Sequence, residues 1–237
     1  MGLNQQNFEQ IAAESYLAWW CDAGVDVAIG NMPHDWLGSA TIKTEIKTAK
    51  SSPVARPMPQ TLEVFVDDLM TGDIADAGPA SRRVRPAGNP ASDLMILTDF
   101  PDAEDIISGE LLGDPLFTKM LTAMGRSRAS VYIASLCPGR PMTGQLSEPS
   151  IVALAEPAKQ HLALIGPKQL WLVGSAASRA ILGVDDAAAR GKLHSVNYQG
   201  LIIKAIATAH PRMFRDHQSR KAAAWVEMQR LLPKETV

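Results

Sequence analysis

The chain has 237 residues, of which 46% are hydrophobic and 20% charged, and its formal net charge is -2. This composition is typical of a globular protein, and the small negative charge excludes a protein that coats nucleic acid by bulk attraction, although a local basic face needs only a few Lys and Arg residues. No apolar run reaches the ~20 residues needed to cross a bilayer, and Met1–Glu14 lacks the features of a signal peptide, so we expect a protein of the cytoplasm without membrane contact.

The N-terminal part of the chain predicts a helical region followed by a linker. Apolar residues recur at helical spacing over Asn7–Ala28. Thr48–Pro59 is rich in proline and predicts a linker, and Thr61–Met70 predicts a short helix within it. We therefore expect an N-terminal helical region at 1–47, a linker with a short helix at 48–87, and a folded domain at 88–237.

The folded domain alternates short apolar runs with helical patterns. The apolar runs have the length and continuity of strands that are buried on both faces: Asp93–Thr98, Val131–Leu136, Gln169–Val173 and Leu201–Ala207. The expected helices are Leu111–Met124, Pro149–Ile165, Ser175–Leu182 and Gln218–Leu232. This order predicts an α/β fold, a three-layer α/β/α sandwich around a central four-stranded parallel sheet.

In a sheet of this kind the ligand crevice lies beyond the carboxyl ends of the strands. The first such loop contains four acidic residues within Thr98–Asp105. Asp102, Glu104 and Asp105 are best explained as caps of the helix that follows. Asp99 is nearest the strand end, and the sequence leaves two roles open for it: activating a water molecule or capping a helix.

Two further loops carry candidate residues. Arg140 follows a rigid Cys-Pro-Gly turn and is suited to meeting a phosphate, although turn structure explains most of this segment. His210 follows the last strand and can donate a hydrogen bond to a developing anion. The segment after it is the most basic of the chain, with Arg212, Arg215, His217, Arg220 and Lys221. Met213 or Phe214 is a candidate to wedge into a base stack, and the alternative for this segment is a solvated helix entry.

Several blocks, in this order, resemble the bacterial family-four uracil-DNA glycosylases. The similar segments are GNPASDLMI (88–96), LFTKMLTAMG (116–125), VYIASLCPGRP (131–141), LALIGPKQLWLVGSAASRAILG (162–183), RGKLH (190–194) and ATAHP (207–211). The resemblance implies the fold of this superfamily, a DNA substrate whose target base is flipped out of the stack, and a place in the bacterial cytoplasm at the nucleoid.

The sequence departs from that family at several positions where the resemblance would place the site. The family's Gly-Glu-Ala-Pro-Gly motif is replaced by Leu97–Pro101, which contains Thr98, Asp99 and Phe100. Asp99 falls where the family-one enzymes carry their water-activating Asp. Ser135 replaces the Asn that reads uracil, and Leu111 or Leu112 replaces the Phe that stacks on it. These departures from the family imply an activity that is weakened, redirected to another lesion, or lost.

The same family binds a four-iron cluster through four cysteines. This chain has two cysteines, Cys21 and Cys137, far apart in sequence. We therefore expect no iron–sulfur cluster, no other metal and no cofactor.

Two functions follow as expectations. The first is a DNA base-excision glycosylase that hydrolyses the N-glycosidic bond of a flipped uracil or other damaged base, with Asp99 and His210 as catalytic residues. Its substrate would be held by Thr98, Phe100, Leu111, Ser135 and Arg140, and its DNA by Arg212, Met213, Phe214 and Arg215. The second is a catalytically degenerate DNA-binding or protein-interaction member of the same fold. We expect a monomer whose partner is DNA, and the sequence identifies no repair protein as a further partner.

Overall fold

The computed structural model describes residues 59–214 and 218–232. The chain separates into two units, Met1–Ser52 and Pro53–Val237, and all the described residues belong to the second. The expected N-terminal helical region, including Asn7–Ala28, lies outside the described residues.

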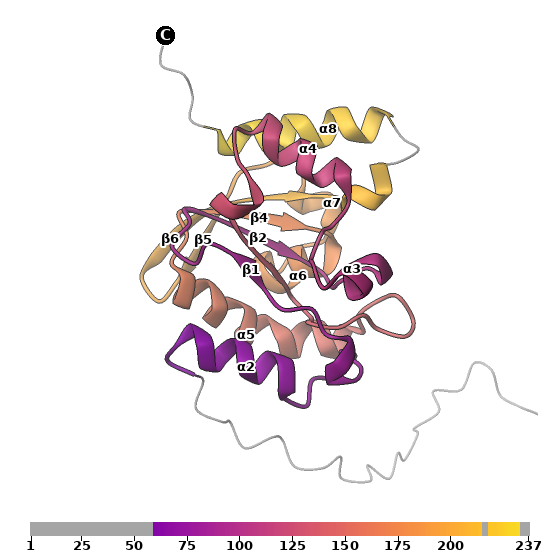
Figure 1. The fold of residues 1–237 in the computed structure, drawn as a ribbon. Helices are drawn as coiled ribbons and strands as arrows, with labels where there is room; N and C mark the ends of the chain where they lie inside the picture. Colours follow the sequence, from indigo (N-terminus) through magenta and orange to yellow (C-terminus); the bar gives the residue numbers. More distant parts are fainter. Residues whose placement is uncertain (1–58, 215–217, 233–237) are drawn as a thin grey trace, which may run out of the picture. The chain divides into compact units, whose positions relative to one another are not determined.

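A six-stranded sheet forms the centre of this unit, in the order β1-β3-β2-β4-β6-β5 (Figure 1). The four inner strands are parallel: β3 (Tyr132–Ser135), β2 (Leu94–Thr98), β4 (Gln169–Val173) and β6 (Leu201–Thr208). They correspond to the four expected apolar runs. Every residue of β2 is buried, as continuous apolar strands require when both faces of a parallel sheet are covered.

The expectation of a four-stranded sheet was incomplete, because the sheet has two more strands at its edges. β1 (Ala87–Gly88) pairs antiparallel with β3, and β5 (His194–Tyr198) pairs antiparallel with β6. β1 is only two residues long, and β5 buries one residue of its five, so neither contains an apolar run. Edge strands of this kind leave little trace in a search for continuous hydrophobic segments.

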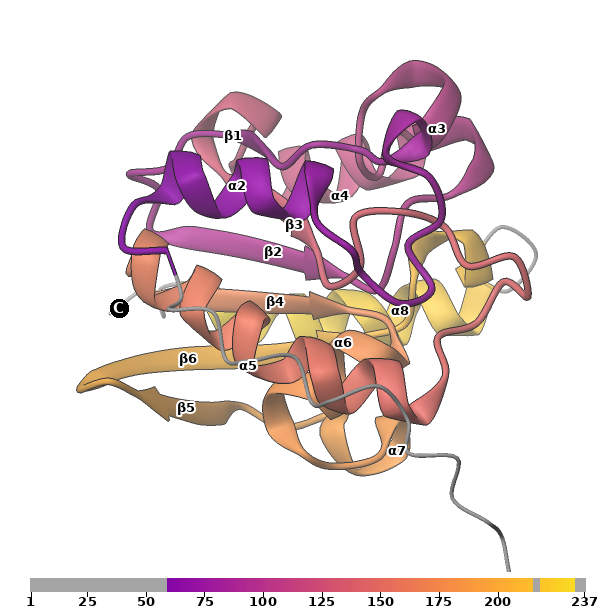
Figure 2. The ribbon, with the colours of Figure 1, turned by 90° about the horizontal axis from the view of Figure 1, so that it is seen from below.

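Helices cover both faces of the sheet (Figures 1 and 2). On one face, α5 (Glu148–Ile165) and α6 (Ser175–Leu182) bury the core that contains Met95, Leu97 and Leu172. On the other face, α4 (Pro115–Ala123) and α8 (Gln218–Met228) cover the core that contains Ile96 and Trp171. The shorter helices are α3 (Ala103–Ser108), α7 (Asp186–Ala189), η1 (Ala80–Arg82), η2 (Arg128–Ser130), η3 (Pro211–Phe214) and η4 (Gln229–Leu231). None of the helices in the described residues is long and apolar enough to cross a membrane.

The helix expected over Leu111–Met124 begins four residues later than predicted. Asp114 is the N-cap of α4, and its side chain accepts a hydrogen bond from the backbone nitrogen of Leu116 at 2.7 Å. Pro115 occupies the first helical position, where its missing N–H is no loss. Leu112 lies before this start with a φ of 54°, a left-handed conformation that no helix continues through.

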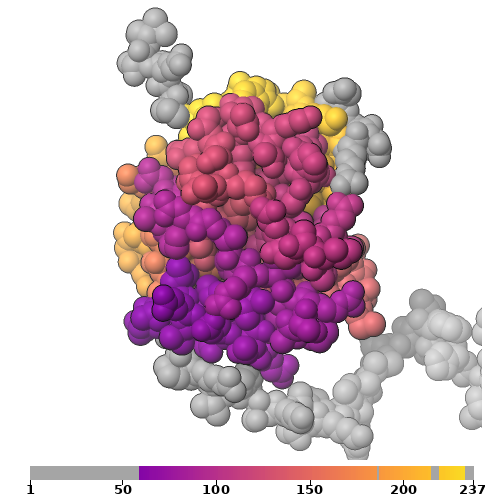
Figure 3. Space-filling view, in the orientation of Figure 1, coloured from indigo at the N-terminus to yellow at the C-terminus, as the bar shows by residue number. Residues whose placement is uncertain are grey.

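α2 (Leu62–Thr71) adds a further layer outside α5. Its buried side chains are Phe65, Val66 and Leu69, and the ring of Phe65 lies 4.8 Å from that of His161 in α5. In the space-filling view, the indigo segment that contains α2 lies directly against the rest of the domain (Figure 3). The short helix within the expected linker is therefore packed on the sheet domain.

We expect Phe65→Ala to lower the free energy of unfolding by about 3–5 kcal/mol, because it removes a buried aromatic side chain and leaves a cavity against His161. The control is Val64→Ala, which truncates a side chain that is 53% exposed on the same helix. Urea unfolding at equilibrium measures both. If Phe65→Ala lowered the free energy of unfolding no more than Val64→Ala does, α2 would not contribute to the folded core.

Candidate active site

The inner strands end side by side, and this brings the hydroxyl residues Thr98, Ser135 and Thr208 to the carboxyl edge of the sheet. Thr98 pairs in register with Ser135 on one side and with Val173 on the other, and Val173 pairs with Thr208. All four residues are buried. The hydroxyl of Thr98 has no hydrogen-bond partner, and an unpaired buried polar atom calls for an explanation, which a substrate group would supply.

Asp99 follows Thr98 and is buried against the start of α6. Its Oδ1 accepts a hydrogen bond from the backbone nitrogen of Ala177 at 2.7 Å. Burial raises the pKa of Asp99 from 3.8 to about 6, although backbone hydrogen bonds from α6 oppose the rise. The carboxyl group thus titrates near neutral pH while it faces the positive end of a helix.

Gly174 is the residue that allows Asp99 to sit there. A Cβ at position 174 would lie 2.3 Å from Asp99 Oδ2, and the φ of Gly174 is 115°, which only glycine adopts readily. The backbone nitrogen of Gly174 donates to the carbonyl of Thr208 at 2.9 Å. Gly174 therefore lies between the ends of β2 and β6, and both candidate catalytic residues follow these strand ends.

His210 is buried and neutral at physiological pH. Burial, with a smaller contribution from the positive charge of Arg212, lowers its pKa to about 4, and Asp102 acts in the opposite direction. Its Nδ1 accepts a hydrogen bond from the backbone nitrogen of Arg212 at 3.3 Å, which places the proton of the neutral ring on Nε2. Nε2 is buried and has no hydrogen-bond partner. The histidine therefore presents an unused donor inside the protein.

One carboxylate joins the loops around this site. Asp102 Oδ1 accepts hydrogen bonds from Arg140 Nη1 at 2.9 Å and from Arg212 Nη1, and Asp102 Oδ2 lies 3.9 Å from His210 Nδ1. Asp102 also forms a capping box with Asp105 at the start of α3. The expected capping role is therefore present, and the bridging role is additional. No sequence pattern indicated it, because the three loops lie far apart along the chain.

Phe100 lies beneath the two arginines. The guanidinium carbons of Arg140 and Arg212 are 5.8 Å and 5.4 Å from the centre of its ring, within the range of a cation–π interaction. Phe100 itself is only 4% exposed, so its ring supports the arginines and is not open as a stacking platform. Both arginine side chains remain 35% exposed and can still reach a phosphate.

Two of the other proposed contact residues, Leu111 and Phe214, lie in the core. Leu111 is fully buried in the core with Phe117, so it offers no surface to a substrate. Phe214 is 2% exposed and packs with Ala224, so it cannot serve as a wedge in this conformation, whereas its neighbour Met213 is 47% exposed. Arg215 lies outside the described residues.

The cysteines do not fit the cluster of the family-four enzymes. Two cysteines cannot supply four thiolates, and Cys137 is buried, with a pKa that burial raises to about 11. Within the described part of the chain, no three His, Cys, Asp or Glu side chains form a group that could hold a metal ion.

A hollow of about 380 Å³ opens at this edge of the sheet, beside Arg140. It is also lined by Arg82, Ile106 and Met142, but neither Asp99 nor His210 lines it. The two candidate catalytic side chains are only 7% exposed. In this conformation a substrate would meet the arginines before it met the catalytic groups.

Comparison with protein families gives one result for this chain. The family model described as the uracil DNA glycosylase superfamily matches residues 85–229, more than half of the chain. The matched segment spans all four inner strands and contains Asp99, Ser135 and His210. No individual curated protein is similar enough to be matched.

We expect Asp99→Asn to raise the free energy of unfolding at pH 7.5 by about 1–3 kcal/mol. Because the fold raises the pKa of Asp99 to about 6, it favours the neutral carboxyl group, and the stability of the wild type falls as the pH rises from about 4 to 6. The amide is neutral throughout and still accepts the bond from Ala177. Chemical unfolding at pH 4.5 and 7.5 measures the difference, which should shrink at the lower pH.

Asp73→Asn, an isosteric change at an exposed position, is the control. If Asp99→Asn were less stable than the wild type at pH 7.5, the hydrogen bonds from α6 would outweigh the burial of the charge.

Proposed function

The chain belongs to the uracil DNA glycosylase superfamily, and we propose that it is a DNA base-excision glycosylase. Its reaction is hydrolysis of the N-glycosidic bond of a flipped uracil or other damaged base. It acts as a monomer in the bacterial cytoplasm and uses neither a metal nor another cofactor. Its catalytic residues lie in the second unit of the chain, Pro53–Val237.

The observation that carries this proposal is the unpaired Nε2–H of His210. When the C–N bond of the nucleotide breaks, the electron pair moves to the base, and negative charge develops on its carbonyl oxygen. A buried, neutral histidine with a free donor stabilises such a charge without first breaking another hydrogen bond. Its pKa of about 4 keeps the ring in this form over the whole physiological range.

Asp99 supplies the second role, on the sugar side of the bond. A water molecule adds its oxygen to the anomeric carbon, and the carboxylate accepts the released proton. With a pKa of about 6, Asp99 is ionised at neutral pH and is still basic enough to take that proton. The departing base then takes up a proton, so the water molecule supplies the hydroxyl group of the sugar and the proton of the free base.

The residues that would read the base differ from those of an enzyme built to read uracil. Ser135 has one hydroxyl where pyrimidine recognition needs an amide, and Leu111 is buried where a stacking ring is expected. The unpaired hydroxyl of Thr98, in register with Ser135, offers a further polar contact. We propose that Ser135 and Thr98 together read the polar edge of the base.

The two arginines above Phe100, Arg140 and Arg212, would bind the phosphates of the DNA. Arg140 and Arg212 share a single carboxylate, which leaves one net positive charge at the entrance to the site. A phosphate can replace Asp102 as their partner at little change in hydrogen bonding. Met213, beside them and exposed, is the candidate wedge.

A specific observation favours a second function, a DNA-binding protein without catalysis. Asp99 already accepts a hydrogen bond from α6, so its carboxylate can be explained as a cap, and both catalytic candidates are buried. Under this alternative the arginines bind DNA, but no base is excised. Measurements of base excision and of DNA binding on the same protein distinguish the two functions.

We expect His210→Ala to lower the single-turnover excision rate by about 10²–10³, because one donor to the developing anion is lost. Asp99→Asn should also slow the reaction, because an amide cannot accept the proton of water. Oligonucleotides that contain uracil, hypoxanthine or a mismatch are the substrates, and Ser195→Ala, on an exposed position of β5, is the control. If the wild type binds DNA and excises none of these bases, the non-catalytic alternative holds.

The rate should also depend on pH through Asp99. The ionised carboxylate is the active form, so we expect the rate to fall about tenfold per pH unit below about 6, and this dependence should be absent in Asp99→Asn. His210 titrates near 4 and adds no step between pH 5 and 8. A wild-type rate that is flat from pH 5 to 8 would contradict the role of Asp99 as a base.

We expect the double variant Arg140→Ala/Arg212→Ala to weaken duplex binding for all sequences alike, because phosphate contacts carry no sequence information. The slope of log K against log salt concentration should flatten by roughly two units, about 0.9 for each lost contact. Fluorescence anisotropy at several salt concentrations measures this. The control is Lys159→Ala on α5, which removes one positive charge and is compared with the single variants Arg140→Ala and Arg212→Ala. If the slope is unchanged in the double variant, the two arginines do not contact DNA.

A further inference from the structure

A larger hollow, of about 750 Å³, lies at the opposite end of the sheet, where β2 and β4 begin. Its walls come from segments that are distant in sequence. They are the residue before β2, the turn after α4, the start of β4, the strand β6, and residues 230–232 after α8. The parallel inner strands point away from it. It is therefore separate from the carboxyl edge and shares no lining residue with the hollow beside Arg140.

This hollow, which we call the amino-edge groove, is strongly basic. Arg126, Lys168, Lys204 and Arg230 line it, and Asp93 is the one acidic residue among its lining residues. Asp93 is paired with Lys168 at 3.2 Å. Within 59–214 and 218–232, no carboxylate pairs with Arg126, Lys204 or Arg230, so three positive charges lie uncompensated around a single groove.

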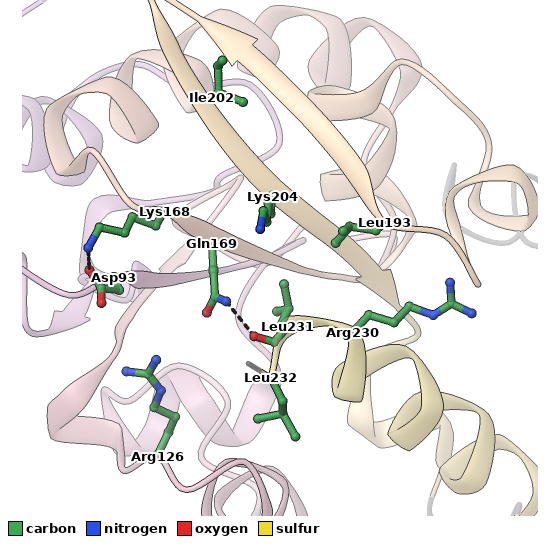
Figure 4. Close-up of a pocket in the computed structure, with 10 residues that line it drawn as sticks. All are labelled: Asp93, Arg126, Lys168, Gln169, Leu193, Ile202, Lys204, Arg230, Leu231 and Leu232. Atoms are coloured by element: carbon green, nitrogen blue, oxygen red, sulfur yellow. Dashed lines mark hydrogen bonds and ion pairs between the residues drawn. The ribbon is translucent and has the colours of Figure 1, made fainter. Parts of the chain in front are cut away.

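The four cations are spread across the groove and do not converge on one point (Figure 4). Arg126 and Lys168 lie on one side, Lys204 lies between, and Arg230 lies on the other side with its guanidinium pointing outward. At the centre, Gln169 donates to the carbonyl of Leu231 at 2.6 Å, which ties the floor of the groove to the segment after α8. A single phosphate cannot neutralise charges that are spread in this way, whereas a chain of phosphates can.

We propose that the amino-edge groove binds the phosphate backbone of a second DNA segment. The groove also has exposed apolar side chains, Ile202 at 74% and Leu193 at 47%, which suit contact with deoxyribose. The two edges are opposite ends of the same strands, about 17 Å apart along β2, and the sheet lies between them, so a straight duplex that lies across one edge does not also lie across the other. The protein therefore joins two DNA segments. This inference rests on the proposed DNA-acting function, but it concerns a different surface.

The test uses the full-length protein and two undamaged duplexes, one with a donor dye and one with an acceptor dye. Energy transfer between them reports bridging, and anisotropy with one duplex reports binding. We expect Arg126→Ala/Lys204→Ala/Arg230→Ala to lower bridging at least tenfold, to flatten the salt slope of bridging by roughly three units, and to retain binding at the carboxyl edge. The charge-matched control is Arg85→Ala/Lys119→Ala/Lys159→Ala, which changes none of the residues that line the groove and should bridge like the wild type.

A wild type that binds one duplex without bridging two would overturn the second site and leave the proposed glycosylase function intact. Bridging without excision of any base would overturn the catalytic function alone. Bridging that survives in the groove variant would also contradict the proposal. Poly-glutamate is the competing probe: if it displaces DNA from the groove as well as an equal concentration of single-stranded DNA does, the groove is a site for acidic peptides and the proposal fails.

Discussion

The carboxylate of Asp102 holds together the three loops on which the candidate site depends. It belongs to the loop after β2, Arg140 to the loop after β3, and Arg212 to the loop after β6. Charge-assisted hydrogen bonds of this kind are stronger than neutral ones, and both guanidiniums also lie within cation–π range of the Phe100 ring. The same arrangement limits function. Arg140 and Arg212 hydrogen-bond to Asp102, so a DNA phosphate that binds them must share them with Asp102 or displace it. The same two positive charges therefore hold the loops together and contact DNA.

A second constraint acts on Asp99. Its carboxylate is buried, which raises its pKa to about 6, and it is tolerated only because Gly174 has no side chain and the start of α6 provides hydrogen-bond donors. A buried charge near its own pKa destabilises the fold at neutral pH. Such groups persist where they are useful in chemistry, and they also occur in purely structural networks. His210 differs in this respect, since a buried donor without a partner stabilises nothing in the protein itself.

The fold separates two surfaces of different character. At the carboxyl edge, Asp102 is paired with Arg140 and Arg212 beside the buried His210, and little net charge remains. At the amino edge, three cations have no acidic partner among the described residues. A chain with a formal charge of -2 therefore still presents a local basic surface, because charge segregates by position in the fold and not by overall composition. A hollow of about 750 Å³ lies at the amino edge, where a search guided only by the carboxyl ends of the strands would not look.

The sequence by itself determined the four inner strands, because parallel strands that are buried on both faces have continuous apolar sequences. It also placed Asp99, Ser135 and His210 at the ends of these strands. It did not determine the edge strands, since β1 has two residues and β5 buries only Val196. It also could not decide between Met213 and Phe214, or reveal that Leu111 is in the core, because the burial of a loop side chain depends on which helix covers it. The bridge at Asp102 and the groove of Arg126, Lys204 and Arg230 were decided by tertiary structure alone, because their members are separated by tens of residues in sequence and only the folded sheet places each set at one edge.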